Sequence, residues 1–198
     1  MTKIIEYEEV ESEQPEAFRF SKEEYLGLFR LGILPANLKT ELINGEIIRQ
    51  MSKGELHSGL VGLIMTYLIK QYPNDEFTFR PEGPVDLPGS SIPEPDLAVC
   101  VYQTAAYTKE YPNEKSTLLI IEIANTSLGY VRGRKKEIYA KAGIPEYWIV
   151  NLVDDQVEVH HTPNVNRGEY EHRTIVHREG RIKSNLLGDH PVERFLAP

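Results

Sequence analysis

Two acidic residues interrupt apolar, strand-like stretches of the sequence. Asp96 comes directly before the apolar run 97–101, and Glu122 lies within the apolar run 118–124. A carboxylate removed from water is unfavourable unless it is hydrogen-bonded, paired with a cation or bound to a metal. Either acid alone could be held by backbone amides at a strand end. Because two such acids lie on adjacent predicted strands, the pair predicts a cation site.

The chemistry of these two side chains indicates which cation would bind. Side chains alternate between the two faces of a strand. If the two strands are neighbours, Asp96 and Glu122 can converge on one ion, and the backbone carbonyl of Ile123 can add a third oxygen. Hard oxygen ligands of this kind suit Mg²⁺ or Mn²⁺. The sequence therefore predicts a site for one of these two metals.

A lysine lies on the helix that is predicted to follow the second strand. At about 100° per residue, Lys135 shares one side of helix 131–142 with Val131, Ile138 and Tyr139, whereas Ala140 falls elsewhere. An ammonium group on an inward-facing stripe needs a partner, and the two carboxylates are suitable partners. The alternative is that Lys135 extends over the sheet edge or forms a structural salt bridge.

The elements that position these residues alternate between strands and helices. Ser21 and Glu24 form a capping box that predicts a helix over 22–31, and Asn44-Gly45 predicts a hairpin over 41–48. An apolar stripe predicts a helix over 54–71 and consists of Leu56, Leu60, Leu63, Ile64, Tyr67 and Leu68. Further strands are expected at 77–80, 96–101, 117–124 and 146–150, and at 156–161 and 169–177 as a terminal hairpin that 180–183 could extend. This order predicts an α/β fold with a mixed β-sheet flanked by helices, an N-terminal hairpin and a C-terminal β-hairpin.

Length and composition limit the class of protein. The 198 residues, 40% hydrophobic and 26% charged, are typical of one soluble globular domain. Residues 6–16 hold six glutamates and no basic residue, so 1–17 is predicted to be a flexible acidic arm before a single domain at 18–198. No apolar run approaches the roughly 20 residues of a membrane span, and the N-terminus does not read as a signal peptide. We therefore expect a cytoplasmic protein that is not membrane-bound.

A longer pattern resembles a known family. The sequence has Pro-x-Pro-Asp at 93–96, a Glu-containing apolar strand at 117–124, and YVRGRKKEIYAKAGIPEYWIV at 130–150. ELINGEI at 41–47, followed by His57, belongs to the same pattern. Together these segments closely resemble a restriction endonuclease family of bacterial proteins. That family lies within the PD-(D/E)XK nuclease superfamily, and the resemblance covers about residues 20–198.

The resemblance implies a restriction-endonuclease-like core and metal-dependent hydrolysis of DNA phosphodiester bonds. On this basis Asp96 and Glu122 are similar to the family's metal ligands. Lys135 resembles a catalytic lysine that has moved from the strand to the helix. Glu46 resembles an auxiliary acid contributed by the N-terminal hairpin. The implied cofactor is Mg²⁺ or Mn²⁺, and the implied partner is DNA.

Two other residues are weaker candidates for the site. His57 lies near the apolar stripe of its helix, where a buried, hydrogen-bonded histidine is the ordinary alternative. Arg132 belongs to the basic cluster 132–136 and could contact phosphates, although a solvated helix face explains that cluster as well. The net charge of −8 argues against a broad non-specific DNA surface but leaves room for such a local strip. No glycine-rich phosphate loop is present, so no nucleotide cofactor is expected.

The sequence leaves alternatives open for both the oligomeric state and the activity. Tyr102, Tyr107 and Tyr111 could pack against a second subunit, and duplex DNA has two strands to cut, so a homodimer is expected. The chain departs from the family at Val131, where an aspartate is usual, and at Gly129, where an acid is frequent. The alternatives are a catalytically impaired relative that acts as a nucleic-acid-binding or protein-interaction module, and a metal hydrolase of small phosphoesters.

Overall fold

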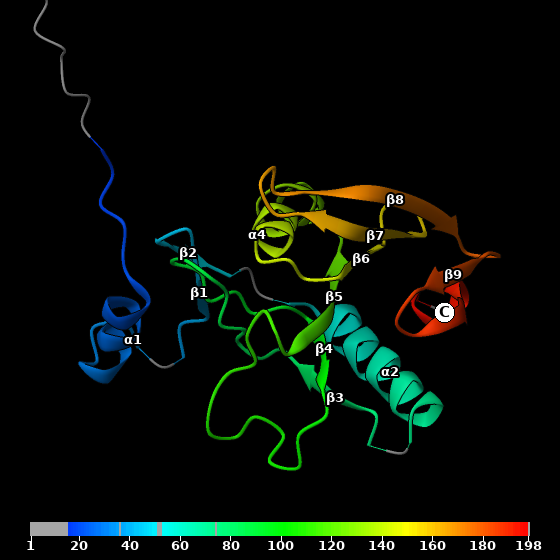
Figure 1. Cartoon of the computed structure of the whole chain (residues 1–198), viewed down its shortest axis with the longest axis horizontal. Helices are drawn as coiled ribbons and strands as arrows, with labels where there is room; N and C mark the ends of the chain where they lie inside the picture. The colour runs from blue at the N-terminus through cyan, green and yellow to red at the C-terminus, as the bar shows by residue number, and fades with distance from the viewer. Residues whose placement is uncertain (1–15, 36, 51–52, 74, 198) are drawn as a thin grey trace, which may run out of the picture.

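A mixed sheet runs through the centre of the molecule in the order β3-β4-β5-β6-β7-β8 (Figure 1). The computed structural model describes residues 16–197 except 36, 51, 52 and 74. The strands are β3 (Phe77–Pro81), β4 (Leu97–Val101), β5 (Thr117–Ala124), β6 (Glu146–Asn151), β7 (Gln156–Asn164) and β8 (Glu169–His177). β5 and β6 are parallel, and the other neighbouring pairs are antiparallel. The predicted mixed sheet is confirmed.

A helical segment connects β5 to its parallel neighbour β6. It consists of α3 (Leu128–Tyr130), a π-helical turn η1 (Val131–Lys135) and α4 (Lys136–Lys141). The connection ends at Gly143, whose φ of 76° is the left-handed conformation common after a helix C-terminus. The helix predicted over 131–142 is therefore confirmed in place, but it begins three residues earlier and contains a wide turn. Ala140 is buried, so the prediction that it faces away from the core was wrong.

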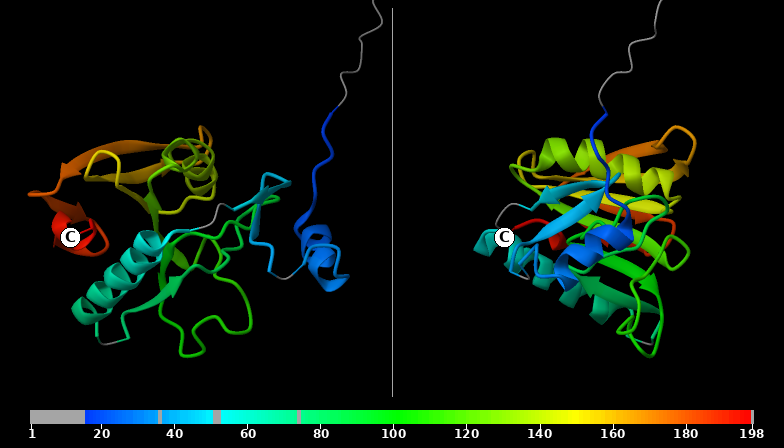
Figure 2. Two further views of the ribbon diagram at one scale, coloured as in Figure 1. Left: turned by 180° about the vertical axis from the view of Figure 1, so that it is seen from behind. Right: turned by 90° about the vertical axis from the view of Figure 1, so that its left-hand side faces the viewer.

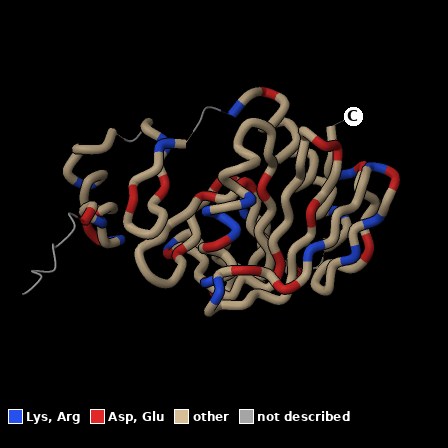
Figure 3. Tube along the Cα trace, turned by 90° about the horizontal axis from the view of Figure 1, so that it is seen from above, with Lys and Arg blue, Asp and Glu red and all other residues tan. Residues whose placement is uncertain are grey.

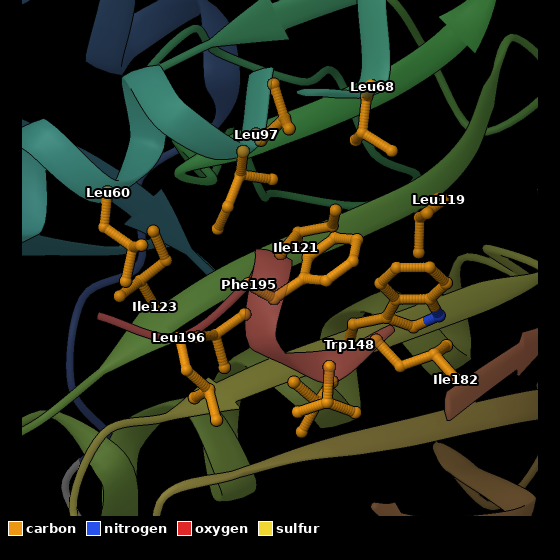
Figure 4. Close-up of a cluster of buried hydrophobic side chains, with 14 of the residues drawn as sticks. Leu60, Leu68, Leu97, Leu119, Ile121, Ile123, Trp148, Ile182, Phe195 and Leu196 are labelled. Atoms are coloured by element: carbon orange, nitrogen blue, oxygen red, sulfur yellow. The ribbon is translucent and has the colours of Figure 1, made fainter. Parts of the chain in front are cut away.

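Each face of the sheet has its own apolar core. One face packs against α2 (Glu55–Gln71) and against the C-terminal elements β9 (Arg181–Ser184), β10 (Gly188–Pro191) and η2 (Val192–Arg194). Figure 4 shows this core, in which side chains from α2 and from the sheet meet Phe195 and Leu196. The helical connection covers the opposite face, so the two helices lie on opposite sides of the sheet (Figure 2).

The apolar stripe of α2 differs in part from the prediction. Leu60, Ile64 and Leu68 are buried as expected. Val61 is buried as well, whereas Leu56 and Leu63 are exposed to solvent over more than half of their surface. The helix therefore packs along a narrower line than the stripe suggested, which leaves apolar side chains on its outer face.

The N-terminal elements lie beside one end of the sheet (Figure 1). α1 (Lys22–Arg30) begins at the predicted capping box. β1 (Thr40–Ile43) and β2 (Glu46–Arg49) form the predicted hairpin, with Asn44 and Gly45 both at positive φ. A Cβ on Gly45 would lie 2.7 Å from Cβ of Arg19, so only glycine fits this turn without displacing its neighbour.

Some other predictions differ from the structure, and some concern residues outside its described part. β9 pairs with β10 in a separate small sheet and does not extend the terminal hairpin. Tyr107 is buried in its own chain, where its hydroxyl donates to the carbonyl of Val101, so it is no free contact surface for a second subunit. Residues 1–15 lie outside the described part, and the division into an arm at 1–17 and a domain at 18–198 stays a prediction. No described helix is long and apolar enough to cross a membrane.

Candidate active site

The two predicted acids lie opposite one another on neighbouring strands. β4 and β5 are antiparallel with Leu97 paired to Ile121, and continuing this register by one residue places Asp96 opposite Glu122. Both carboxylates are buried. The backbone N–H of Ile123 donates to Oδ2 of Asp96 at 2.7 Å, which ties the two strand ends together. The predicted adjacency of the two strands is confirmed.

Asp96 is also held by one group from the loop before α2 and by one from the first turn of that helix. Its Oδ1 accepts from Nζ of Lys53 at 2.6 Å and lies 2.8 Å from Nε2 of His57. Burial acts to raise the pKa of Asp96, but the hydrogen bond from His57 and the charge of Lys53 outweigh it and lower the pKa to about 2. Asp96 is therefore ionised at neutral pH.

Glu122 is held from the helical connection on its face of the sheet. Nζ of Lys135 and the hydroxyl of Tyr139 both donate to Oε1 of Glu122, each at 2.9 Å. Burial raises the pKa of Glu122 to about 7 despite the lowering by Lys135, and the nearby charge of Asp96 acts in the same direction as burial. Oε2 of Glu122 accepts no hydrogen bond from any described residue.

Glu41 of β1 completes the cluster and was not predicted. It is buried, and its Oε2 lies 3.2 Å from Nζ of Lys135 and accepts from the backbone N–H of Glu94 at 3.0 Å. The hydroxyl of Tyr130 donates to Oε1 of Glu41 at 2.9 Å. The N-terminal hairpin thus supplies an acid to the site, but that acid comes from its first strand.

The π-helical turn explains how two helical residues reach the same carboxylate. In an α-helix, residues five apart point about 140° away from each other. A π turn closes its hydrogen bond over five residues, so positions five apart lie one above the other. Tyr130 and Lys135 are five apart across η1, and both contact Glu41. π turns are rare and are frequent at functional sites.

Lys135 is a buried ammonium group with three acceptors around it. It contacts Glu122, Glu41 and the backbone carbonyl of Glu94, the last at 3.1 Å. Burial lowers the pKa of Lys135, but the two carboxylates outweigh burial and leave the pKa above its ordinary value. Lys135 is therefore charged at neutral pH, which suits a role as a donor and excludes a role as a proton acceptor.

These side chains line one cavity of about 440 Å³. Acidic groups from three strand regions and basic groups from β2, α2 and η1 meet there, and acidic and basic stretches lie close together in the middle of the molecule (Figure 3). Residues 125–127, which follow β5, add polar side chains to the lining of the cavity. The charged and acid–base residues that line the cavity are Glu41, Arg49, Lys53, His57, Glu94, Asp96, Glu122 and Lys135.

Two predicted site residues lie elsewhere. Glu46 is on the surface of the hairpin, where it pairs with Arg19 at 2.9 Å and Arg134 at 2.8 Å, and it does not line the cavity. Arg132 pairs with Glu158 and Asp154 on the side of β6 and β7. His57, by contrast, is brought into the site through Asp96.

Sequence reasoning also missed two residues that the structure brings to the site. All four residues of β1 are buried, so the strand lacks the alternation that would have distinguished Glu41 from Glu46. Lys53 lies in the loop before α2, where periodicity gives no orientation. The sequence signal for Glu41 was an acid directly before the apolar pair Leu42-Ile43, and Glu46 before Ile47-Ile48 carries the same signal.

The donor set is compatible with a hard divalent cation. Glu122 lines the cavity with one carboxylate oxygen that no described residue engages, and the raised pKa of its carboxyl marks a place where a further positive charge would be stabilising. Among the described residues, no group of three or more His, Cys, Asp or Glu side chains is already arranged as a metal site. Both carboxylate oxygens of Asp96 already have partners, Oδ1 in Lys53 and His57 and Oδ2 in the backbone N–H of Ile123.

Comparison with known proteins identifies the family. Residues 23–189 match the Uma2 family, which is described as "Putative restriction endonuclease". The chain belongs to the Uma2 family. Membership confirms the resemblance seen in the sequence, and restriction-endonuclease-like families generally use divalent metals.

A solved structure supports the same fold. A crystal structure of "a putative nuclease belonging to DUF820" from Anabaena variabilis superimposes with a TM-score of 0.68, covering 89% of this chain and 97% of that one at 15% identity. The likeness at this identity concerns the fold, which is nuclease-like. No curated protein matched the sequence. The Uma2 chain described here therefore has an α/β, restriction-endonuclease-like fold.

Proposed function

We propose that this protein is a metal-dependent endonuclease that hydrolyses phosphodiester bonds of DNA. The observation that carries the proposal is the meeting of Asp96, Glu122 and Lys135 in one cavity of a chain from a restriction endonuclease family. Asp96 and Glu122, with the carbonyl of Ile123, are the residues that would hold Mg²⁺ or Mn²⁺. When bound, such an ion polarises the phosphate and lowers the pKa of a water molecule.

The protein's own residues supply positioning and charge. Lys135 is held charged by two buried carboxylates, so it can donate to a water molecule or to the phosphate oxygens that gain negative charge. Glu41 takes the place that the family resemblance implied for Glu46, since it fixes Lys135 from the hairpin side. His57 orients Asp96 and belongs to the same proposed site.

Binding of DNA would use the basic residues at the cavity. Arg49 lines the cavity and is exposed, so it can neutralise a phosphate in a chain whose net charge of −8 is otherwise unfavourable for DNA. Lys53 also lines the cavity, but it already pairs with Asp96 and Glu82, so it would approach a phosphate only by sharing its charge with them. Arg132 would contribute only at the periphery, because Glu158 already engages it.

The test is cleavage of supercoiled, nicked and single-stranded DNA in Mg²⁺ or Mn²⁺. Wild-type protein is expected to cut, whereas Asp96→Asn and Glu122→Gln are expected to lose activity. Glu46→Gln is the matched control, because this acid lies on the same hairpin as Glu41 but outside the cavity. Cutting that persists in both site variants would remove the assignment.

One observation favours a second candidate function. Val131 is buried and lines the cavity at the position where the family usually has an aspartate. A site without that acid suits a catalytically impaired relative that binds nucleic acid or a protein. DNA binding without cleavage by the wild-type chain, together with cleavage by Val131→Asp, would favour this candidate.

Two further proposals accompany the nuclease. A metal hydrolase of small phosphoesters would use the same carboxylates, and turnover of a small phosphodiester without cleavage of DNA would favour it. We also retain the cytoplasm as the expected location, which fractionation of cells that express the full chain tests.

A further inference from the structure

The outer face of α2 has an unusual composition for a helix surface exposed to water. No Asp, Glu, Lys or Arg occurs from residue 56 to residue 69. Leu56, Leu63 and Ile69 are exposed by 56%, 55% and 45%. Single exposed apolar residues are ordinary, but several on one uncharged helix surface mark a contact site. Within the described part of the chain, nothing covers this face.

Small residues occupy the middle of the same face. At about 100° per residue, Gly59, Gly62 and Thr66 lie opposite the buried line of the helix, with Leu56 and Leu63 along one side. Apart from the neighbouring residues and the backbone of its own helix, a Cβ at Gly59 or Gly62 would meet no described atom within 4 Å. Each helical glycine costs about 1 kcal/mol relative to alanine. The packing of this chain does not require these glycines, but close approach by another helix backbone would.

The charges at the two ends of the helix indicate what that second helix is. Glu55 lies at the first turn and Lys70 at the last, and both are exposed. If α2 meets a second copy of itself in antiparallel orientation, each Glu55 faces Lys70 of the partner subunit. A parallel arrangement would place like charges together. Two copies of a chain with a net charge of −8 repel one another, so contact is favoured where the surface carries no net charge, and here the single acid Glu55 is balanced by Lys70.

We propose that the outer face of α2 is the contact surface of a symmetric homodimer with the two α2 helices antiparallel. A twofold axis near Gly62 and Leu63 places Gly59 opposite Thr66 of the partner subunit, and Leu63 beside Leu63 of the partner subunit. Such an isologous contact requires a self-complementary surface, and this one combines a line of small residues with apolar neighbours. Because Gly54, Leu56 and His57 line the candidate cavity, the dimer holds its two cavities at opposite ends of the helix pair.

The test is the molecular mass of the full chain in solution, measured by sedimentation equilibrium over a range of concentrations. Wild-type protein is expected to be a dimer. Leu63→Glu places two charges near the axis and is expected to weaken the dimer at least about 30-fold, as for a central contact residue. Leu31→Glu is the matched control, since Leu31 follows the last residue of α1, is 76% exposed and should leave the dimer intact. Circular dichroism of each variant establishes that it is folded.

A charge exchange tests the antiparallel orientation. Glu55→Lys is expected to weaken the dimer, and adding Lys70→Glu to the same chain is expected to restore it. A monomeric wild-type chain, a dimer that survives Leu63→Glu, equal dissociation by Leu31→Glu, or a double variant that fails to recover would each overturn the proposal. None of these outcomes depends on DNA cleavage, so the dimer and the nuclease assignment can fail independently.

Discussion

Glu158 and the acids of the cavity are buried at different places in the described part of the chain, and they are neutralised differently. Glu158 of β7 is fully buried, and it accepts from Nε of Arg132 at 2.9 Å, from Arg173 at 2.8 Å and from Asn151 at 3.2 Å. Burial acts to raise the pKa of Glu158, but His160 and the two arginines outweigh burial and hold the pKa well below its ordinary range. The single negative charge of Glu158 is thus paired with two positive charges, those of Arg132 and Arg173.

The cavity has the opposite balance. Glu41, Asp96 and Glu122 are three buried carboxylates that share the ammonium groups of Lys53 and Lys135. One carboxylate oxygen of Glu122 stays unpaired among the described residues, and the pKa of this acid is raised to about 7. A buried carboxylate whose charge is fully paired stabilises the fold. Where buried carboxylates outnumber the cationic groups beside them, a further cation can bind. The comparison therefore supports the proposal that Glu158 serves stability and that the cavity serves function.

The largest effect is expected when the shared lysine is removed. Lys135→Met leaves two buried carboxylates without their common partner, so we expect a loss of roughly 3 kcal/mol in the free energy of unfolding and about 100-fold in DNA cleavage. Arg132→Met is the matched change in the other group, where Arg173 continues to hold Glu158. Cleavage assays and urea unfolding measure both effects. Equal loss of activity in the two variants would erase the distinction.

The second largest difference is expected in how Mn²⁺ changes the stability of variants at Glu158 and at Glu122. At about 100 times its dissociation constant, a ligand that binds only the folded state adds about 2.7 kcal/mol of stability. We expect Mn²⁺ to raise the melting temperature of wild-type protein and of Glu158→Gln, and a chelator to reverse the rise. Glu122→Gln should show no such rise. A Mn²⁺ effect that is lost in Glu158→Gln and kept in Glu122→Gln would place the ion in the wrong group.

The two acids should also give opposite dependences of stability on pH. The folded-state pKa of Glu158 is lowered from 4.5, so its contribution is present above that value and is lost as the pH falls. The pKa of Glu122 is raised from 4.5 to about 7, so the folded state binds its proton more tightly and stability declines as the pH rises between these values. Relative to wild type, Glu158→Gln should lose stability mainly above pH 4.5, and Glu122→Gln should gain it towards pH 7. Urea unfolding across this range measures both, and parallel curves would contradict the assignment.

A smaller effect is expected from one tyrosine hydroxyl. Tyr139→Phe removes a donor to Glu122, which should cost about 1 kcal/mol of stability and roughly tenfold in Mn²⁺ affinity. Tyr147→Phe is the control, because the buried hydroxyl of Tyr147 donates to the carbonyl of Val131 and not to an acid of the cavity. Calorimetric titration with Mn²⁺ distinguishes them. Equal affinities in the two variants would show that the hydroxyl does not position Glu122.

The sequence was informative where local chemistry determines structure. Asn44-Gly45 predicts the hairpin turn, and the acids within apolar strands indicate Asp96 and Glu122, which lie opposite one another in the sheet. The stripe on the helix after β5 correctly placed Lys135 on the buried side. These features follow from backbone conformation and from the unfavourable burial of charge, which are legible along the chain.

The sequence was less informative where packing between distant segments decides which side chain is buried. Glu41 and Glu46 lie on the same hairpin, and only the packing of β1 against the rest of the protein makes Glu41 the buried one. Lys53 reaches Asp96 across 43 positions of the sequence, which no local pattern encodes. The exposed position of Leu63 likewise depends on how α2 lies on the sheet.

The π-helical turn at Val131–Lys135 makes the number of residues as important as their identity. α4 is anchored in the core by Ile138 and Tyr139, while Tyr130 on the other side of the turn reaches the N-terminal hairpin. Deleting Gly133 would shorten the turn to an ordinary α-helical one and rotate Tyr130 by about 100° relative to Lys135. Every side chain of the cavity would remain, yet the hairpin would lose its link to the helix. Insertions and deletions at this turn are therefore expected to be tolerated less well than substitutions.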